Sequence, residues 1–233
     1  RLDLTEFEDI FKEINEQETI QKIDLPLEFI SLCNKHLPLH SQTPLEYLKT
    51  RGIGKAEILR WKMGYCKEGR YSGRIIIPSI NNDGDCNYFI ARSYVGHGRR
   101  YLNPPCGRDI VFNSLMVDWD EPVVLVEGVF DAIVVGDNAI PILGSTLRED
   151  SRLFQALAIH DTPVYVALDP DAEKKAQWII KSLMRYDLEV KKINLEEYED
   201  IGSMSKQVFL EKLQNAEEVD SDMYFLERIL KSI

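Results

Sequence analysis

Residues 123–213 alternate short apolar runs with amphipathic segments, and this alternation constrains the fold more than any other feature of the chain. The apolar runs span 123–126, 139–143, 164–168 and 188–193, and the amphipathic segments span 129–135, 149–159, 172–186 and 204–213. Continuous runs of Val, Ile and Leu are typical of strands buried on both faces. Strands that alternate with helices over short connections form a parallel sheet covered by helices. The sequence therefore predicts an α/β fold here.

Carboxylates follow three of these four strands. Glu127 ends the first, with Asp131 in the first turn of the next helix; Asp169 and Asp171 follow the third, and Asp200 lies in the loop after the fourth. The carboxyl ends of parallel strands share one edge of the sheet, so we expect these acids to meet. Their mutual repulsion would raise their pKa values unless cations neutralise them. Oxygen ligands without a nearby His or Cys suit Mg²⁺ or Mn²⁺, and two such ions are a standard apparatus of phosphoryl transfer.

Each acidic motif also has a purely structural explanation. Asp169-Pro170-Asp171 is a good helix start, with an N-cap acid and a proline at the first helical position. Asp131 could be first-turn charge, and Asp200 could be solvated. The second strand ends instead in Gly144-Ser145-Thr146, a small-residue turn whose backbone N–H groups could approach a phosphate.

The charge is distributed unevenly along the chain. The net charge is −11, yet residues 49–108 carry 12 Lys and Arg against 4 Asp and Glu. Such asymmetry predicts one basic surface that faces a polyanion and another that is acidic. A basic face that is merely solvated is the alternative.

The basic segment reads as a small α+β unit. Thr43 is the expected N-cap of a helix with Pro44 at its first position, and a second helix covers 55–61. Two strands, 74–78 and 87–94, flank turn residues at 81–85. Arginines and tyrosines interleave on the second strand and the loop after it, and could hold phosphates and stack on bases. A surface hairpin with ordinary charge is the alternative.

The two ends of the chain predict no chemistry. Apolar residues at helical spacing before residue 15 predict one helix, and a last amphipathic segment runs from Asp222 to Ile233. Because the chain opens on Arg1, we expect a part of a longer protein.

The four cysteines make no CxxC pair, which favours reduced thiols and no zinc site. No membrane span or signal peptide is expected.

The acidic motifs, taken in order, resemble those of the TOPRIM domain, which bacterial-type primases, topoisomerases and some nucleases share. Three upstream motifs resemble the amino-terminal subdomain of the catalytic core of DnaG-type primases: Tyr47-Leu48-Lys49-Thr50-Arg51-Gly52-Ile53, Arg74-Ile75-Ile76-Ile77-Pro78 and Arg100-Tyr101-Leu102-Asn103-Pro104. The resemblance covers roughly residues 43–213.

This resemblance implies a DNA-templated RNA polymerase that makes short primers from ribonucleoside triphosphates on single-stranded DNA. It implies a TOPRIM-type parallel sheet flanked by helices, preceded by a smaller α+β subdomain. The implied divisions are an N-terminal helical segment (1–42), the basic subdomain (43–118), the TOPRIM domain (119–213) and a C-terminal helix (214–233). The implied catalytic residues are Glu127, Asp131, Asp169 and Asp171. The metal ligands are Glu127, Asp169, Asp171 and Asp200, for two or more Mg²⁺ or Mn²⁺ ions. The nucleic-acid or nucleotide contacts are Arg74, Arg92, Arg99, Arg100, Tyr101, Asn103, Gly128, Gly144 and Ser145.

The sequence departs from the family at two motifs. Pro170 replaces the usual glycine between the two aspartates, and the last motif carries Asp200 without the usual pair of aspartates around a proline. The family's zinc module and a helicase P-loop do not occur, so we expect helicase docking through parts outside this chain. The implied location is the cytoplasm of a bacterial cell, with a phage-encoded origin as one option. A TOPRIM nuclease and a non-catalytic DNA-binding scaffold of recombination or repair are the alternative functions.

Overall fold

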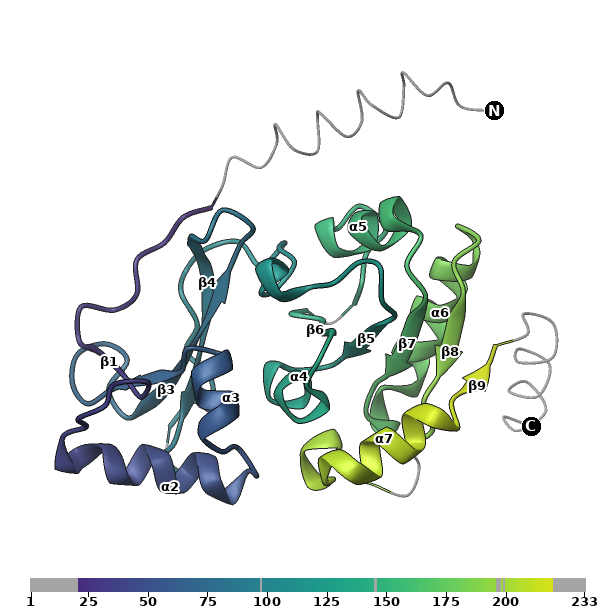
Figure 1. Cartoon of the computed structure of the whole chain (residues 1–233). Coiled ribbons are helices and arrows are strands. Elements are labelled where there is room, and N and C mark those ends of the chain that lie inside the picture. The colour runs from purple at the N-terminus through teal and green to yellow at the C-terminus, as the bar shows by residue number, and fades with distance from the viewer. Residues whose placement is uncertain (1–20, 97, 145, 196–197, 199, 220–233) are drawn as a thin grey trace.

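The computed structural model describes residues 21–219, apart from 97, 145, 196–197 and 199. The described chain forms two sheets that lie side by side (Figure 1). A four-stranded sheet belongs to the amino-terminal half and a five-stranded sheet to the carboxyl-terminal half. The expected first helix lies outside the described residues.

The first sheet is antiparallel throughout, in the order β1-β2-β3-β4. Its strands are β1 (Phe29–Ser31), β2 (Gly64–Cys66), β3 (Arg74–Ile80) and β4 (Cys86–Ser93). The predicted pairing of β3 with β4 is confirmed, whereas β1 and β2 were not predicted. Each of these two strands has only three residues, too few to show an alternating pattern.

Two helices follow β1, and the first begins earlier than the sequence predicted. α2 spans Gln42–Thr50 and α3 spans Lys55–Arg60. Ser41, not Thr43, is the N-cap of α2, because a 3₁₀ turn η1 (Leu39–Ser41) leads directly into the helix. Pro44 is therefore the third helical residue, where its missing N–H group still leaves no helical hydrogen bond unmade.

The second sheet has the order β6-β5-β7-β8-β9. Its strands are β5 (Val123–Val126), β6 (Ala139–Pro141), β7 (Val164–Ala167), β8 (Val190–Lys192) and β9 (Glu217–Glu218), and its helices are α4 (Val129–Val135), α5 (Arg152–His160), α6 (Glu173–Met184) and α7 (Lys206–Gln214). The first four strands are parallel, which confirms the predicted fold class.

The edge strand β9 runs antiparallel to β8, so residues 217–218 form a strand within the segment 214–233 that was expected to be a helix. Lys191 pairs with Glu218 and Lys192 with Glu217 across the two strands. The ammonium of Lys191 lies 3.6 Å from Oε1 of Glu218, and opposite charges placed directly across two strands stabilise their pairing. The amphipathic segment 222–233 lies outside the described residues.

The side chains of β5 alternate between two cores. Val124 and Val126 share a core with α4, α7 and buried residues of the amino-terminal half, such as Leu48 and Ile75. Val123 and Leu125 pack with α5 and α6 on the opposite face. Because the first core is continuous across both halves, it fixes the basic half beside α4 (Figure 1).

Two further observations bear on the expectations from sequence. Cys33, Cys66, Cys86 and Cys106 are free thiols. Among the described residues, none of the helices has both the length and the apolar character needed to cross a bilayer.

Candidate metal and nucleic-acid site

The first acidic corner lies where β5 turns into α4. β5 ends at Val126, Glu127 follows, and Gly128 is the N-cap of α4. The backbone N–H of Gly128 donates to Oδ2 of Asp131 at 2.9 Å. This bond orients the Asp131 carboxylate toward the start of its helix, and it uses the backbone N–H group of Gly128, a predicted nucleotide contact.

The second corner lies at the end of β7, next to β5 in the sheet. Asp169 precedes the 3₁₀ turn η3 (Pro170–Ala172), which contains Asp171 and leads into α6. Pro170 stands at the start of that turn, so its fixed φ is compatible with the local backbone. One carboxylate oxygen each from Glu127, Asp169 and Asp171 lies within 4.8 Å of the others. The expected convergence is therefore present for these three residues.

The third corner follows β8. Asp200 is the N-cap of η4 (Ile201–Ser203), and α4 contacts this turn. A Cβ atom placed on Gly202 would lie 3.4 Å from Oδ1 of Asp200 and 3.9 Å from Oδ1 of Asp131. These distances bring Asp200 and Asp131 to the same side of the acidic cluster.

The oxygen ligands of this cluster fit a hard divalent cation. Oδ1 of Asp169 is buried without a hydrogen-bond partner in the described structure. A buried carboxylate oxygen with no donor is costly unless a cation supplies its partner. Three converging carboxylates without thiol or imidazole ligands are the donor set that Mg²⁺ or Mn²⁺ prefers.

Burial and mutual repulsion raise the pKa of two of these acids. Burial, followed by repulsion from the carboxylates of Asp131, Glu127, Asp200 and Asp171 in that order, raises the pKa of Asp169 to about 7. Burial also raises the pKa of Asp131 to about 6, although the Gly128 N–H hydrogen bond acts in the opposite direction. Asp169 is therefore partly protonated at neutral pH when no metal ion neutralises the cluster.

In the absence of metal, the free energy of unfolding should consequently decrease as the pH rises from about 5 to about 8. A folded-state pKa above the unfolded value means that the proton stabilises the folded chain; this contribution is complete below about pH 4 and is lost as the pH passes through about 6 to 7. We expect a loss of about 1–2 kcal/mol after allowance for solvent screening. Thermal unfolding in the presence of chelator, at several pH values, measures this loss. The stability of the Asp169→Asn variant should depend less steeply on pH than that of the unmodified chain.

Lys175 is a site residue that the sequence analysis missed. Its Nζ lies 3.2 Å from Oε1 of Glu127 and 3.3 Å from the carbonyl oxygen of Gly144. Lys175 lies in the first turn of α6, four residues after Asp171, which stands in the preceding turn η3. That spacing was the available signal. The carbonyl of Gly144 thus faces a cation, whereas Ser145 lies outside the described residues.

The basic half meets the acidic cluster at Phe130 of α4. The guanidinium carbons of Arg51 and Arg92 lie 5.2 and 5.3 Å from the centre of the Phe130 ring. Arg51 comes from the end of α2 and Arg92 from β4, so these two arginines from separate elements of the basic half pack on the residue next to Asp131. Arg51 also lowers the pKa of Asp131, in opposition to the burial of that carboxyl. Arg51, like Lys175, was not predicted as a site residue.

Arg74 and Asn103 support the backbone of the basic half. Arg74 is buried, and it donates from Nη2 to the carbonyl oxygen of Arg99 at 2.8 Å. Oδ1 of Asn103 accepts from the backbone N–H of Ala91 at 3.2 Å. The Arg74 guanidinium thus supports the loop that presents Arg99 and Arg100, because it donates to backbone carbonyl groups. Its contact with nucleic acid stays a prediction.

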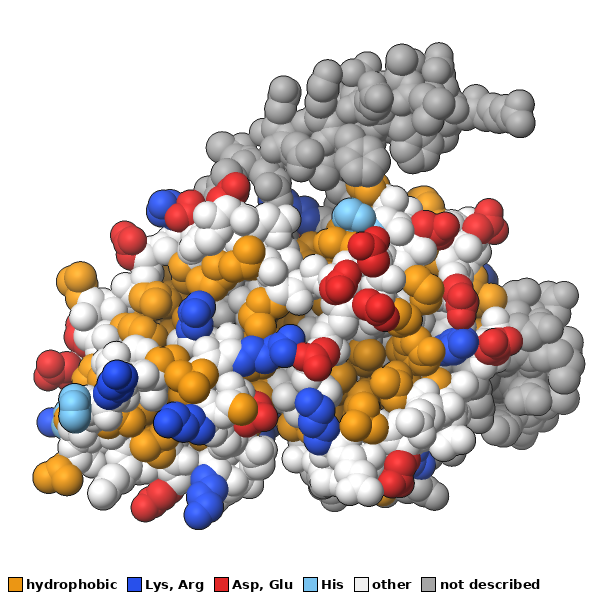
Figure 2. All heavy atoms as spheres, viewed as in Figure 1, with side chains coloured by type: hydrophobic (Ala, Val, Ile, Leu, Met, Phe, Trp, Pro, Cys, Tyr) orange, Lys and Arg blue, Asp and Glu red, His pale blue; other side chains and the backbone are white. Residues whose placement is uncertain are grey.

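Two arginines contact Tyr101: the buried Arg92 of β4 and the exposed Arg100 of the loop. Arg92 donates to the Tyr101 hydroxyl at 2.6 Å, and the guanidinium carbon of Arg100 lies 5.8 Å from the ring centre. Arg99, Arg100 and Tyr101 are exposed. Figure 2 shows Lys and Arg side chains over the amino-terminal half and at its boundary with the carboxyl-terminal half. A flat ring beside cations is suited to stacking and phosphate contacts.

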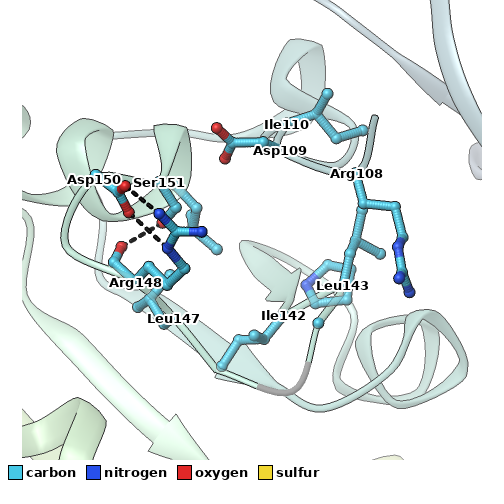
Figure 3. A pocket seen from close by; sticks show the side chains of 12 residues that line it. Arg108, Asp109, Ile110, Ile142, Leu143, Leu147, Arg148, Asp150 and Ser151 are labelled. Carbon is cyan, nitrogen blue, oxygen red and sulfur yellow. Dashed lines mark hydrogen bonds and ion pairs between the residues drawn. The ribbon is translucent and has the colours of Figure 1, made fainter. Parts of the chain in front are cut away.

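A cavity of about 260 Å³ adjoins the site at Gly144. Its floor is apolar, and Arg108 and Arg148 stand on opposite sides of it (Figure 3). Arg148 is paired with Asp150, and the Asp109 carboxylate accepts from the backbone N–H of Arg152 at the start of α5. The rim charges are thus largely balanced within the chain.

Comparisons with known proteins place this fold. No protein-family model matches the chain. The sequence is 26% identical to the DNA primase of Thermotoga maritima over 153 residues, which is 58% of this chain and 27% of that relative. The chain therefore spans about a quarter of the length of the curated relative that it matches.

Solved structures extend the likeness to nearly the whole chain. A DnaG primase catalytic domain bound to single-stranded DNA has a TM-score of 0.71 at 14% identity, and the match covers 99% of this chain and 85% of that one. A DNA primase domain from Pseudomonas aeruginosa has a TM-score of 0.68 at 17% identity, covering 95% and 83%. The resemblance to DnaG-type primases drawn from the sequence motifs is therefore confirmed for the fold.

Proposed function

We propose that this chain, which has the fold of the DnaG-type primase catalytic core, is the RNA polymerase core of a DNA primase. It would join ribonucleoside triphosphates into short primers on a single-stranded DNA template. One observation carries the proposal: Glu127, Asp169 and Asp171 converge within 4.8 Å at the carboxyl edge of the parallel sheet, beside a half that carries exposed arginines. Nucleotidyl transfer needs both features, since it requires metal-binding carboxylates next to a surface for polyanions.

The five carboxylates of the cluster would have different roles according to their positions. Glu127, Asp169 and Asp171 would hold the metal, and Asp131 and Asp200 complete the negative charge around it. Two or more Mg²⁺ or Mn²⁺ ions bound there would activate the attacking hydroxyl and stabilise the leaving pyrophosphate. The protein contributes fixed oxygen ligands, because the three side chains come from the rigid ends of two neighbouring strands.

The basic half would hold the template and the incoming nucleotide. Arg99, Arg100 and Tyr101 present exposed cations and one aromatic ring on the same loop, which suits a flexible single strand. Arg92 is buried between Tyr101 and Phe130, so it would fix the loop relative to the metal ligands. Contact with a replicative helicase would reside outside this chain.

The decisive experiment is primer synthesis itself. Single-stranded DNA, labelled ribonucleotides and Mg²⁺ or Mn²⁺ are incubated with the chain, and both primer products and degraded template are scored. Metal-dependent primers support the proposal. Template cleavage without primers would identify a nuclease, and DNA binding without either product would identify a scaffold.

Arg100→Ala should weaken binding to single-stranded DNA by roughly three- to tenfold and reduce the salt slope by about one unit, because one phosphate contact is lost. Fluorescence anisotropy over a range of salt concentrations measures both quantities. Arg185→Ala is the matched control, since Arg185 is an exposed arginine paired with Glu149 in the other half of the chain. An Arg100→Ala variant with an unchanged salt slope would contradict the assigned template surface.

A further inference from the structure

Lys175 occupies a position that an ordinary surface lysine does not. Its side chain is only 12% exposed, although the neighbouring Lys174 is exposed. A lysine gives up that much hydration only where fixed acceptors replace the water. The acceptors here are Oε1 of Glu127 and the carbonyl oxygen of Gly144.

The same Glu127 carboxylate belongs to the converging acidic triad. Glu127, Asp169 and Asp171 come within 4.8 Å of one another, and Asp131 and Asp200 add further negative charge nearby. The ammonium of Lys175 forms an ion pair with the Glu127 carboxylate of this triad at 3.2 Å. The largely enclosed ammonium of Lys175 is therefore paired with a carboxylate of the converging triad.

We propose that Lys175 is a resident counter-cation that competes with the divalent metal for Glu127. This inference rests on the metal-dependent function proposed above. Without metal, the ammonium partly neutralises the acidic cluster and stabilises the folded chain. When a divalent ion binds, Glu127 must share its charge with that ion, and the ammonium repels the ion. Lys175 thereby sets the metal concentration at which the site fills.

The proposal predicts a change in metal affinity with a definite sign. Lys175→Met removes the competing charge and keeps most of the apolar stem, so Mn²⁺ should bind roughly tenfold more tightly. A lysine that only held Glu127 in place would give the opposite result, because its loss would loosen a ligand and weaken Mn²⁺ binding.

The test measures Mn²⁺ binding directly, by calorimetric titration of the whole chain without nucleotide or DNA. Lys175→Arg keeps the charge and should remain within about twofold of the unmodified chain. Lys174→Met removes the same formal charge from the adjacent exposed position and should also remain within about twofold. In chelator, Lys175→Met should unfold at a lower temperature than Lys174→Met. Saturating Mn²⁺ should reduce the difference between the unfolding midpoints of these two variants.

The outcomes separate this inference from the proposed function. Unchanged or weaker Mn²⁺ binding by Lys175→Met, with normal binding by the unmodified chain, overturns the counter-cation role alone. Tighter binding by Lys175→Met supports that role even if the chain makes no primers. An unmodified chain that binds no Mn²⁺ overturns both.

Discussion

Asp169→Asn should abolish primer synthesis, with a loss of about a thousandfold or more, while binding to single-stranded DNA stays within about twofold. A carboxylate oxygen of Asp169 converges with those of Glu127 and Asp171, and its Oδ1 is buried with no hydrogen-bond partner among the described residues. An amide keeps the shape of the side chain but removes the charge that would hold a metal ion. The proposed DNA surface lies on the amino-terminal half of the chain, so binding to DNA should be unaffected.

The same variant should be more stable than the unmodified chain when metal is absent. At about pH 8, the Asp169 carboxylate is charged in spite of its raised pKa, and its charge repels the other acids of the cluster. Replacement by Asn removes this repulsion, and we expect the midpoint of thermal unfolding in chelator to rise by about 2–4 °C. A rise in stability combined with a loss of activity is the signature of a site residue, since a damaged core would lower both.

Asp187→Asn is the matched control for this experiment. Asp187 is exposed and has a left-handed backbone with φ of 59°, a conformation that Asn also adopts readily. It should change neither the activity nor the unfolding midpoint by a measurable amount. Primer synthesis that survives in Asp169→Asn at the level of this control would contradict the assigned metal site.

The meeting of the acids could be predicted because it follows from topology. Once the apolar runs are read as parallel strands, Glu127 and Asp169 must reach the same edge whatever the details of packing. Asp131 and Asp200 followed from the same rule. The alternation of apolar and amphipathic segments was strong enough to place four strands and four helices.

Side-chain roles in the basic half could not be predicted in the same way. The segment Arg74–Ile80 is buried along almost its whole length, so its sequence gives no period that separates an inner from an outer face. Arg74 was therefore assigned to nucleic acid, although its guanidinium faces carbonyl groups inside the fold. Lys175 shows a related limit, because its spacing of four residues from Asp171 does not give the rotation of α6 toward Glu127.

Phe130→Ala should lower the free energy of unfolding by about 3–5 kcal/mol. Phe130 is 6% exposed in the core that joins both halves. Its ring also lies against the guanidinium groups of Arg51 and Arg92, and each such contact adds about 0.5–1 kcal/mol. Equilibrium unfolding in urea measures the loss, and Phe130→Leu should retain most of the stability because it keeps most of the volume.

Phe130→Ala should also weaken binding to single-stranded DNA by roughly tenfold under conditions in which it remains folded, because Arg92 loses the ring that seats it beside Tyr101. Phe209→Ala provides the comparison. Phe209 is fully buried in the same core, on α7, and its ring meets no arginine among the residues that the structure describes. The two alanine variants should lose similar stability, but only Phe130→Ala should lose affinity. Equal affinities would mean that Phe130 only fills the core, and that the arginines of the basic half find their positions without it.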